Sequence, residues 1–150
     1  MLSFLKEILT EKELSDLGEI LDFSLNTKID LEKTQEHIAH ANYYHSKLTK
    51  IIYKLRLNHT DLEIAYDQWY SVAFHETIDN YDGREEFLKT PKDFEREIKR
   101  LPEYKENRTL LDKIQASIKS LESKEKELLT FDWKVKSIID IHKIQHGIKY

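Results

Sequence analysis

Basic and aromatic side chains alternate along the stretch between residues 43 and 56. Its cations follow one another with no acidic residue between them: Lys47, Lys50, Lys54 and Arg56. On a helix, Tyr43 and Tyr53 fall on the same side as the three lysines. Cations that track phosphates and rings that stack on bases of any sequence suit single-stranded nucleic acid. We call these six residues the basic–aromatic stripe, although a charged outer face also keeps an ordinary coiled coil in solution.

No other set of side chains has the order or spacing that catalysis needs. There is no Cys, which excludes disulfides, thiolate catalysis and Cys-ligated zinc. Ser-His-Asp ordering and a Gly-rich phosphate loop are also missing. His37 with His40, and His142 with His146, have helix-face spacing but lack the carboxylates of a recognised metal motif. We therefore expect a protein that is not an enzyme and that needs no metal or cofactor.

The stripe belongs to a longer stretch, Leu31 to Ala73, which carries a heptad seam and no Gly or Pro. The seam positions are Leu31, Thr34, Ile38, Ala41, His45, Leu48, Ile52, Leu55, His59, Leu62, Tyr66, Trp69 and Ala73. An apolar spacing of about 3.5 residues predicts one long helix that must be covered by a second helix of the chain, by copies of the chain, or by both. Within the seam, His45 and His59 fit a role in setting register better than metal binding or pH sensing.

Composition favours an all-α protein. Charged residues make up 35% of the 150 residues, with 3 Gly and 2 Pro, which suits helices with solvated faces. The formal net charge of -4 argues against a uniformly basic nucleic-acid binder but allows a local basic stripe. With no signal-peptide pattern and no apolar run of membrane-spanning length, we expect a soluble intracellular protein.

The chain is expected to form a single helical domain, 1–150. Its parts are an N-terminal docking helix (1–25), the long helix (29–75), a loop (76–91) and C-terminal helices (92–147). Thr10 and Glu13 have capping-box spacing in the first part. A second long helix from about residue 103 to 129 is the natural antiparallel partner of the first. Together with a closing helix, it supplies the residues predicted to lie between subunits: Leu111, Ile118, Leu121, Val135, Ile138 and Ile139.

The end of the chain carries a pattern of its own. Residues 135–140 read Val-Lys-Ser-Ile-Ile-Asp, with Trp133 before them and 143–144 (Lys-Ile) and Gly147 after them. This pattern resembles the end of the phage recombination mediator family called UvsY. The order of a long helix ending in an aromatic pair, a loop, a short helix, a long helix and a closing segment is also similar, and the resemblance covers roughly 29–147.

The resemblance implies a ring-like homo-oligomer of six or seven subunits in the cytoplasm of a host cell. Such a protein binds single-stranded DNA, contacts the phage single-strand-binding protein and helps to load the phage recombinase. The resemblance implies no nucleotide or metal. The basic pair of the family falls here on Ile64 and Tyr66. Strand binding is therefore expected at the basic–aromatic stripe, with Lys136 and Lys143 as further candidates. The alternative is a structural or scaffold coiled coil, or a helical adaptor, without nucleic-acid binding.

Overall fold

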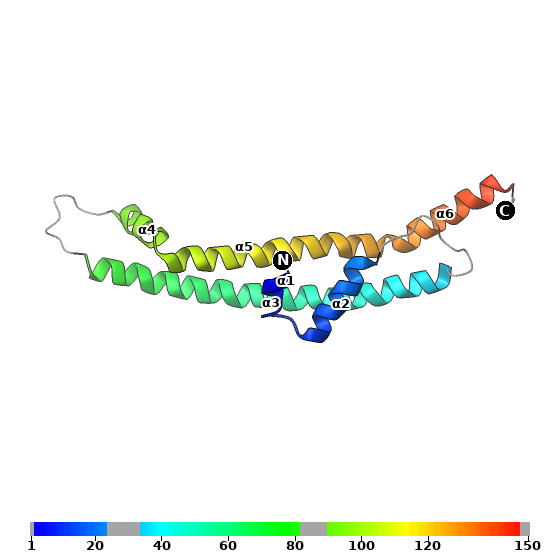
Figure 1. Ribbon diagram of the computed structural model, residues 1–150. Helices are drawn as coiled ribbons and strands as arrows, with labels where there is room; N and C mark the ends of the chain where they lie inside the picture. Colours follow the sequence, from blue (N-terminus) through cyan, green and yellow to red (C-terminus); the bar gives the residue numbers. More distant parts are fainter. Residues whose placement is uncertain (1, 24–33, 82–89, 148–150) are drawn as a thin grey trace. The chain divides into compact units, whose positions relative to one another are not determined.

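The computed structural model describes residues 2–23, 34–81 and 90–147, in which the regular structure is entirely helical. The helices are α1 (Leu2–Leu5), α2 (Glu11–Asp22), α3 (Thr34–Asp79), α4 (Pro91–Lys99), α5 (Pro102–Leu129) and α6 (Phe131–Gln145) (Figure 1). The all-α prediction is confirmed.

The chain divides into two compact units, to which α3 and α5 both contribute. The first unit comprises 1–55 and 118–150, and the second comprises 56–117. The first unit therefore contains α1, α2, the beginning of α3, the end of α5 and α6, whereas the second contains the rest of α3, α4 and the beginning of α5.

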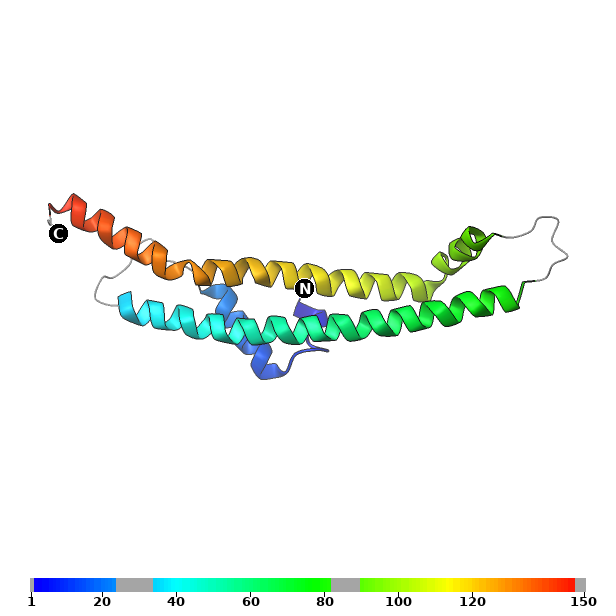
Figure 2. The ribbon, with the colours of Figure 1, turned by 180° about the vertical axis from the view of Figure 1, so that it is seen from behind.

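In the first unit, α3 and α5 run antiparallel, as expected. The Thr49 hydroxyl of α3 donates to a carboxylate oxygen of Glu125 in α5 at 3.1 Å. The Phe23 ring, just after α2, lies 5.1 Å from the ring of Tyr44 and 5.3 Å from that of Phe131. Helix α2 crosses α3 within this unit, as the views from both sides show (Figure 1, Figure 2). The buried side chains come from every helix of the unit and include Leu5, Leu17, Ile20, Leu48, Ile52, Leu55, Leu121 and Val135.

In the second unit, α3 packs against α4 and α5 through aromatic rings. The rings of Tyr66 and Tyr104 have centroids 6.0 Å apart, which joins α3 to α5. Those of Phe74 and Phe94 meet edge to face at 6.2 Å, which joins α3 to α4. Aromatic pairs in such offset and edge arrangements stabilise a contact beyond the area that they bury. These contacts place the aromatic end of α3 against the second half of the chain.

The predicted seam of α3 is confirmed over its described positions. Each of them, from Ile38 to Ala73, is buried or half-buried; Leu31 and the side chain of Thr34 lie outside the described part. One buried position of α3 is not on the seam: Ile51 is only 3% exposed. Together with residues of α2, it lines a groove between the two helices. Helix α3 is thus covered on a second side, which the seam alone did not predict.

Two predicted boundaries were wrong. The N-terminal segment 1–25 does not form one helix, because the helical structure is interrupted between α1 and α2, and Thr10 is the N-cap of α2. Its backbone N–H donates to Glu13 at 3.1 Å, and the Glu13 N–H donates to the Thr10 hydroxyl at 3.2 Å, which confirms the capping box. Helix α3 also continues beyond residue 75, since the Asn80 N–H still donates to the Glu76 carbonyl at 2.9 Å.

Truncating a buried and an exposed leucine of α3 tests this packing. Leu55 is fully buried, whereas Leu57, two residues later, is 49% exposed. We expect Leu55→Ala to lower the free energy of unfolding by about 2–5 kcal/mol, because it leaves a cavity in the core. The matched variant Leu57→Ala should change it by about 0.5 kcal/mol. Urea unfolding followed by circular dichroism, at one protein concentration, measures both, and equal losses would contradict the assigned face.

Candidate nucleic-acid interface

The tyrosines of the basic–aromatic stripe project into solvent. Tyr43 is 54% exposed and Tyr53 is 63% exposed, although both are large apolar rings. The Lys47 ammonium lies over the Tyr43 ring, 4.5 Å from its centroid. A cation over the face of an aromatic ring is attracted by the ring quadrupole. Helix α3 therefore presents rings and cations together, which is what stacking on bases beside phosphates requires.

Two lysines of the stripe are paired with carboxylates of α2. Lys47 Nζ lies 3.0 Å from Asp16 Oδ1, and Lys54 Nζ lies 2.6 Å from Glu13 Oε1. The pattern along α3 gave no sign of these partners, because they come from a helix more than thirty residues earlier. No acidic residue stands between the cations of the stripe in the sequence, but in the fold two carboxylates of α2 lie against its lysines.

The electrostatics of these pairs follow from their geometry. Partial burial opposes ionisation of Glu13, but hydrogen bonds from Lys54 and from Thr10 outweigh it and hold the pKa of Glu13 below its usual value. The Tyr43 hydroxyl and then the Asp16 carboxylate raise the pKa of Lys47 above its usual value. Both groups therefore remain charged at neutral pH, and the cover of α2 on α3 is ionic there.

A groove of about 280 Å³ lies between α2 and α3 at these pairs. It is lined by Lys12, Glu13, Asp16, Lys47, Lys50 and Ile51. The side chains of Lys12 and Lys50 add positive charge to the groove, and both residues are exposed. Lys50 thus lines the groove beside the two ion pairs.

The other candidate strand-binding residues lie elsewhere. Arg56 is exposed and belongs to the second unit. Lys136 and Lys143 lie on α6, where Lys136 Nζ is 3.2 Å from Asp132, one turn earlier. Lys143 is half-buried. None of these three side chains lines the groove between α2 and α3.

The residues predicted to lie between subunits divide into two groups. Leu111, Ile118, Leu121 and Val135 are buried within a single chain, where they fill its own core. Ile138 and Ile139 are half-buried on α6. The sequence reading missed the apolar side chains of α6 that are most exposed: Trp133 at 70%, Ile141 at 55% and Ile144 at 71%. The sequence shows that α6 is rich in apolar side chains, but only the packing shows which face of α6 belongs to the core.

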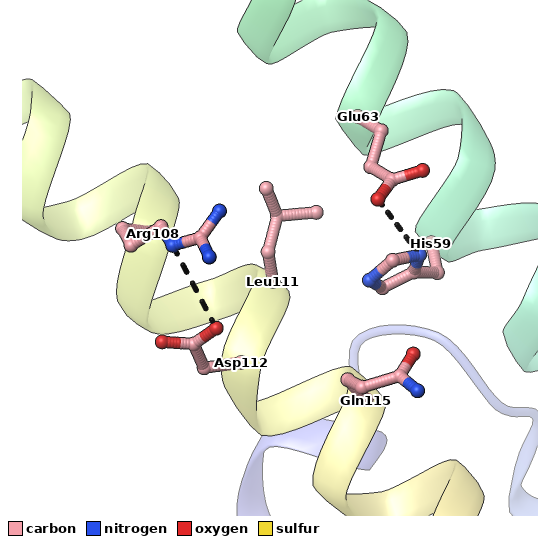
Figure 3. Close-up of a pocket in the computed structure, with 6 residues that line it drawn as sticks. All are labelled: His59, Glu63, Arg108, Leu111, Asp112 and Gln115. Atoms are coloured by element: carbon pink, nitrogen blue, oxygen red, sulfur yellow. Dashed lines mark ion pairs between the residues drawn. The ribbon is translucent and has the colours of Figure 1, made fainter.

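A second cleft, of about 340 Å³, lies between α3 and α5 in the second unit. Figure 3 shows His59 and Glu63 on α3 facing Arg108, Leu111, Asp112 and Gln115 on α5. His59 and Arg108 each have a carboxylate one turn away on their own helix, at 3.8 Å for His59 Nδ1 to Glu63 and 3.8 Å for Arg108 Nε to Asp112. Arg108 is paired with Asp112 on its own helix, so the cleft offers no unpaired arginine for an anionic ligand. In the part of the chain that the structure describes, no three His, Asp or Glu residues are grouped as a metal site.

Ile64 and Tyr66 are the two positions where the resemblance to UvsY led us to look for a basic pair, and neither carries a positive charge. Ile64 is 53% exposed, whereas Tyr66 is half-buried against Tyr104. Burial, then the hydrogen bond and charge of Tyr104, raise the pKa of Tyr66 to about 12. A phenol in this setting is neutral and supports packing between α3 and α5. It supplies no positive charge for phosphate.

Comparison with known proteins found no match to a family model, to a curated protein or to a solved structure. Of the described helices, none combines the length and apolarity needed to cross a membrane.

Acidification tests the ionic cover of α2. Because the pKa of Glu13 is lowered in the folded state, its contribution to stability is present above the ordinary value of 4.5 and is lost as the pH falls through the folded value. We expect the urea midpoint of the wild type to exceed that of Glu13→Gln at pH 7, and the difference to shrink at pH 3. Glu11→Gln, in the same first turn of α2, controls for loss of a charge near the helix N-terminus. An unchanged gap at pH 3 would contradict the assignment.

Proposed function

We propose that this protein binds single-stranded DNA along the exposed side of α3 and acts as a recombination mediator. In this role it assists loading of a phage recombinase onto strands coated by single-strand-binding protein. The observation that carries the proposal is the pairing of exposed rings with ammonium groups on one helix face: Lys47 over Tyr43, and Tyr53 exposed beside Lys50 and Lys54.

The proposed mechanism is exchange of bound proteins and involves no covalent chemistry. Each subunit contributes a few phosphate contacts and ring surfaces, which are individually weak. Linking many such sites raises the effective concentration of each, so that an assembly holds a strand that one subunit would release. Contacts of this kind can be broken one at a time. A strand held in this way stays accessible to the recombinase that replaces the first protein coat.

Self-association is the second part of the proposal. Trp133, Ile141 and Ile144 form an exposed apolar surface on α6, and large apolar patches on soluble proteins favour association. This surface lies in the closing segment that resembles the mediator family. We propose a ring-like homo-oligomer of six or seven subunits that contacts the recombinase and the single-strand-binding protein, located in the cytoplasm of the host cell.

A structural coiled coil without nucleic-acid binding is the alternative. The observation that favours it is the pairing of Lys47 with Asp16 and of Lys54 with Glu13, which leaves less positive charge for phosphates. The formal net charge of -4 points in the same direction. The two functions differ in one measurable property, which is salt-dependent binding of an oligonucleotide.

Titration of a fluorescent single-stranded oligonucleotide at several salt concentrations tests strand binding. Lys50→Gln should reduce the slope of log affinity against log salt by about 0.7, because it removes a phosphate contact. Tyr53→Ala should cost about 1–3 kcal/mol per stacked base with little change in slope. Lys126→Gln removes an exposed lysine of α5 as the matched control. If neither stripe variant differs from the control, the structural coiled coil is the better account.

Sedimentation tests self-association. We expect the wild type to form an oligomer larger than a dimer at micromolar concentration, and Ile144→Asp to shift it to smaller species, because a charge in an apolar contact has no partner. Ile64→Asp makes the same change at an isoleucine of α3 that is 53% exposed and serves as the control. A monomeric wild type, or equal effects of the two variants, would rule out α6 as the subunit contact.

A further inference from the structure

We propose that α2 is an internal competitor for the strand, whose carboxylates occupy the two lysines that phosphates would otherwise bind. This inference rests on the proposed function and adds a form of regulation to the same site. Asp16 and Glu13 lie at 3.0 and 2.6 Å from the ammonium groups of Lys47 and Lys54, the distances of direct ion pairs. A carboxylate at such a distance takes the place of a phosphate oxygen.

The acidic composition of α2 suits this role. Its sequence, EKELSDLGEILD, contains five acidic residues and one basic residue. Leu17 and Ile20 lie one turn after Glu13 and Asp16 on the same side of the helix, are fully buried, and anchor this side in the core of the first unit. The acidic groups are therefore held at the lysines by packing as well as by charge. A strand gains Lys47 and Lys54 only when α2 moves away.

The structure also indicates how α2 can be released. Its ion pairs are part-exposed, with side chains of Lys54 and Glu13 retaining 42% and 26% of their accessible surface. Pairs of this kind are weak and are screened by salt. A helix of 12 residues is marginal once it loses its packing, so that undocked α2 is expected to unfold. Undocking and unfolding of α2 are then one step. A strand drives this step when its phosphates replace the carboxylates of α2 at Lys47 and Lys54.

Two full-length variants with opposite expected effects test the competition. Glu13→Gln with Asp16→Asn removes both ion pairs and should tighten oligonucleotide binding about two- to thirtyfold. Its control is Glu19→Gln with Asp22→Asn, which removes the same charge from exposed positions of α2. Gly18→Ala changes no charge and meets no atom within 4 Å of the added Cβ. Because it stabilises helical α2, it should weaken binding by up to about fivefold.

Hydrogen exchange gives a second readout on the wild type. Addition of a single-stranded oligonucleotide should increase exchange of the amides of residues 11–22, and should leave those of the buried part of α3 protected. Tighter binding of Glu13→Gln/Asp16→Asn than of its control, weaker binding of Gly18→Ala, and faster exchange in α2 support the proposal. Binding only by Glu13→Gln/Asp16→Asn also supports it.

The outcomes that overturn the proposal also separate it from the proposed function. If all four proteins bind the oligonucleotide equally and α2 stays protected, strand binding stands and the competition is wrong. Equal tightening by both charge-removing variants would assign the effect to net charge alone, and the competition would again be wrong. If no protein binds at any salt concentration, the proposed function fails and this inference fails with it. Circular dichroism of each variant confirms that α3 remains helical.

Discussion

The stability of both compact units depends on covering the apolar seam of α3 with other helices. A single helix exposes such a stripe along its whole length, and packing of its apolar face provides most of the stability of a helix in a protein. In the first unit α5 covers the seam, α2 and α6 add buried side chains to the same core, and the seam residues Leu48, Ile52 and Leu55 are buried. In the second unit, Tyr104 of α5 contacts the seam residue Tyr66, and Phe94 of α4 contacts Phe74, next to the seam residue Ala73. The exposed faces of α3 are available for function because the seam is buried against other helices.

The sequence was informative wherever local chemistry decides the outcome. The capping box of Thr10 and Glu13 was predicted correctly because it depends on residues only three apart in the sequence. The seam of α3 was correct because the helical period is fixed by backbone geometry. The two wrong boundaries, at Thr10 and after residue 75, are element ends, where a single hydrogen bond extends or stops a helix.

The candidate site could be predicted only in part, since its partners are distant in the sequence. The rings and lysines of α3 were found from their spacing on one helix face. Asp16 and Glu13 could not be paired with them, because nothing in the local pattern of α2 specifies which residues of α3 it crosses. Ile51 carries the same lesson: it lies off the seam and is buried where α2 lies alongside. An acidic helix elsewhere in the chain is a reason to doubt that a basic stretch is free.

The strength of the cover on α3 also bears on why assembly would matter. The part-exposed ion pairs contribute little to the docking of α2. Displacing α2 also uncovers Leu17 and Ile20, and a fully buried aliphatic side chain is worth about 1.5–3 kcal/mol. One subunit would have to recover this free energy from a few phosphate and ring contacts, so that its net affinity would be low. In an oligomer joined through α6, binding at one subunit raises the effective concentration of strand at the next. Under the proposed function, weak sites with an internal competitor would hold a strand collectively and release it site by site, as exchange of one bound protein for another requires.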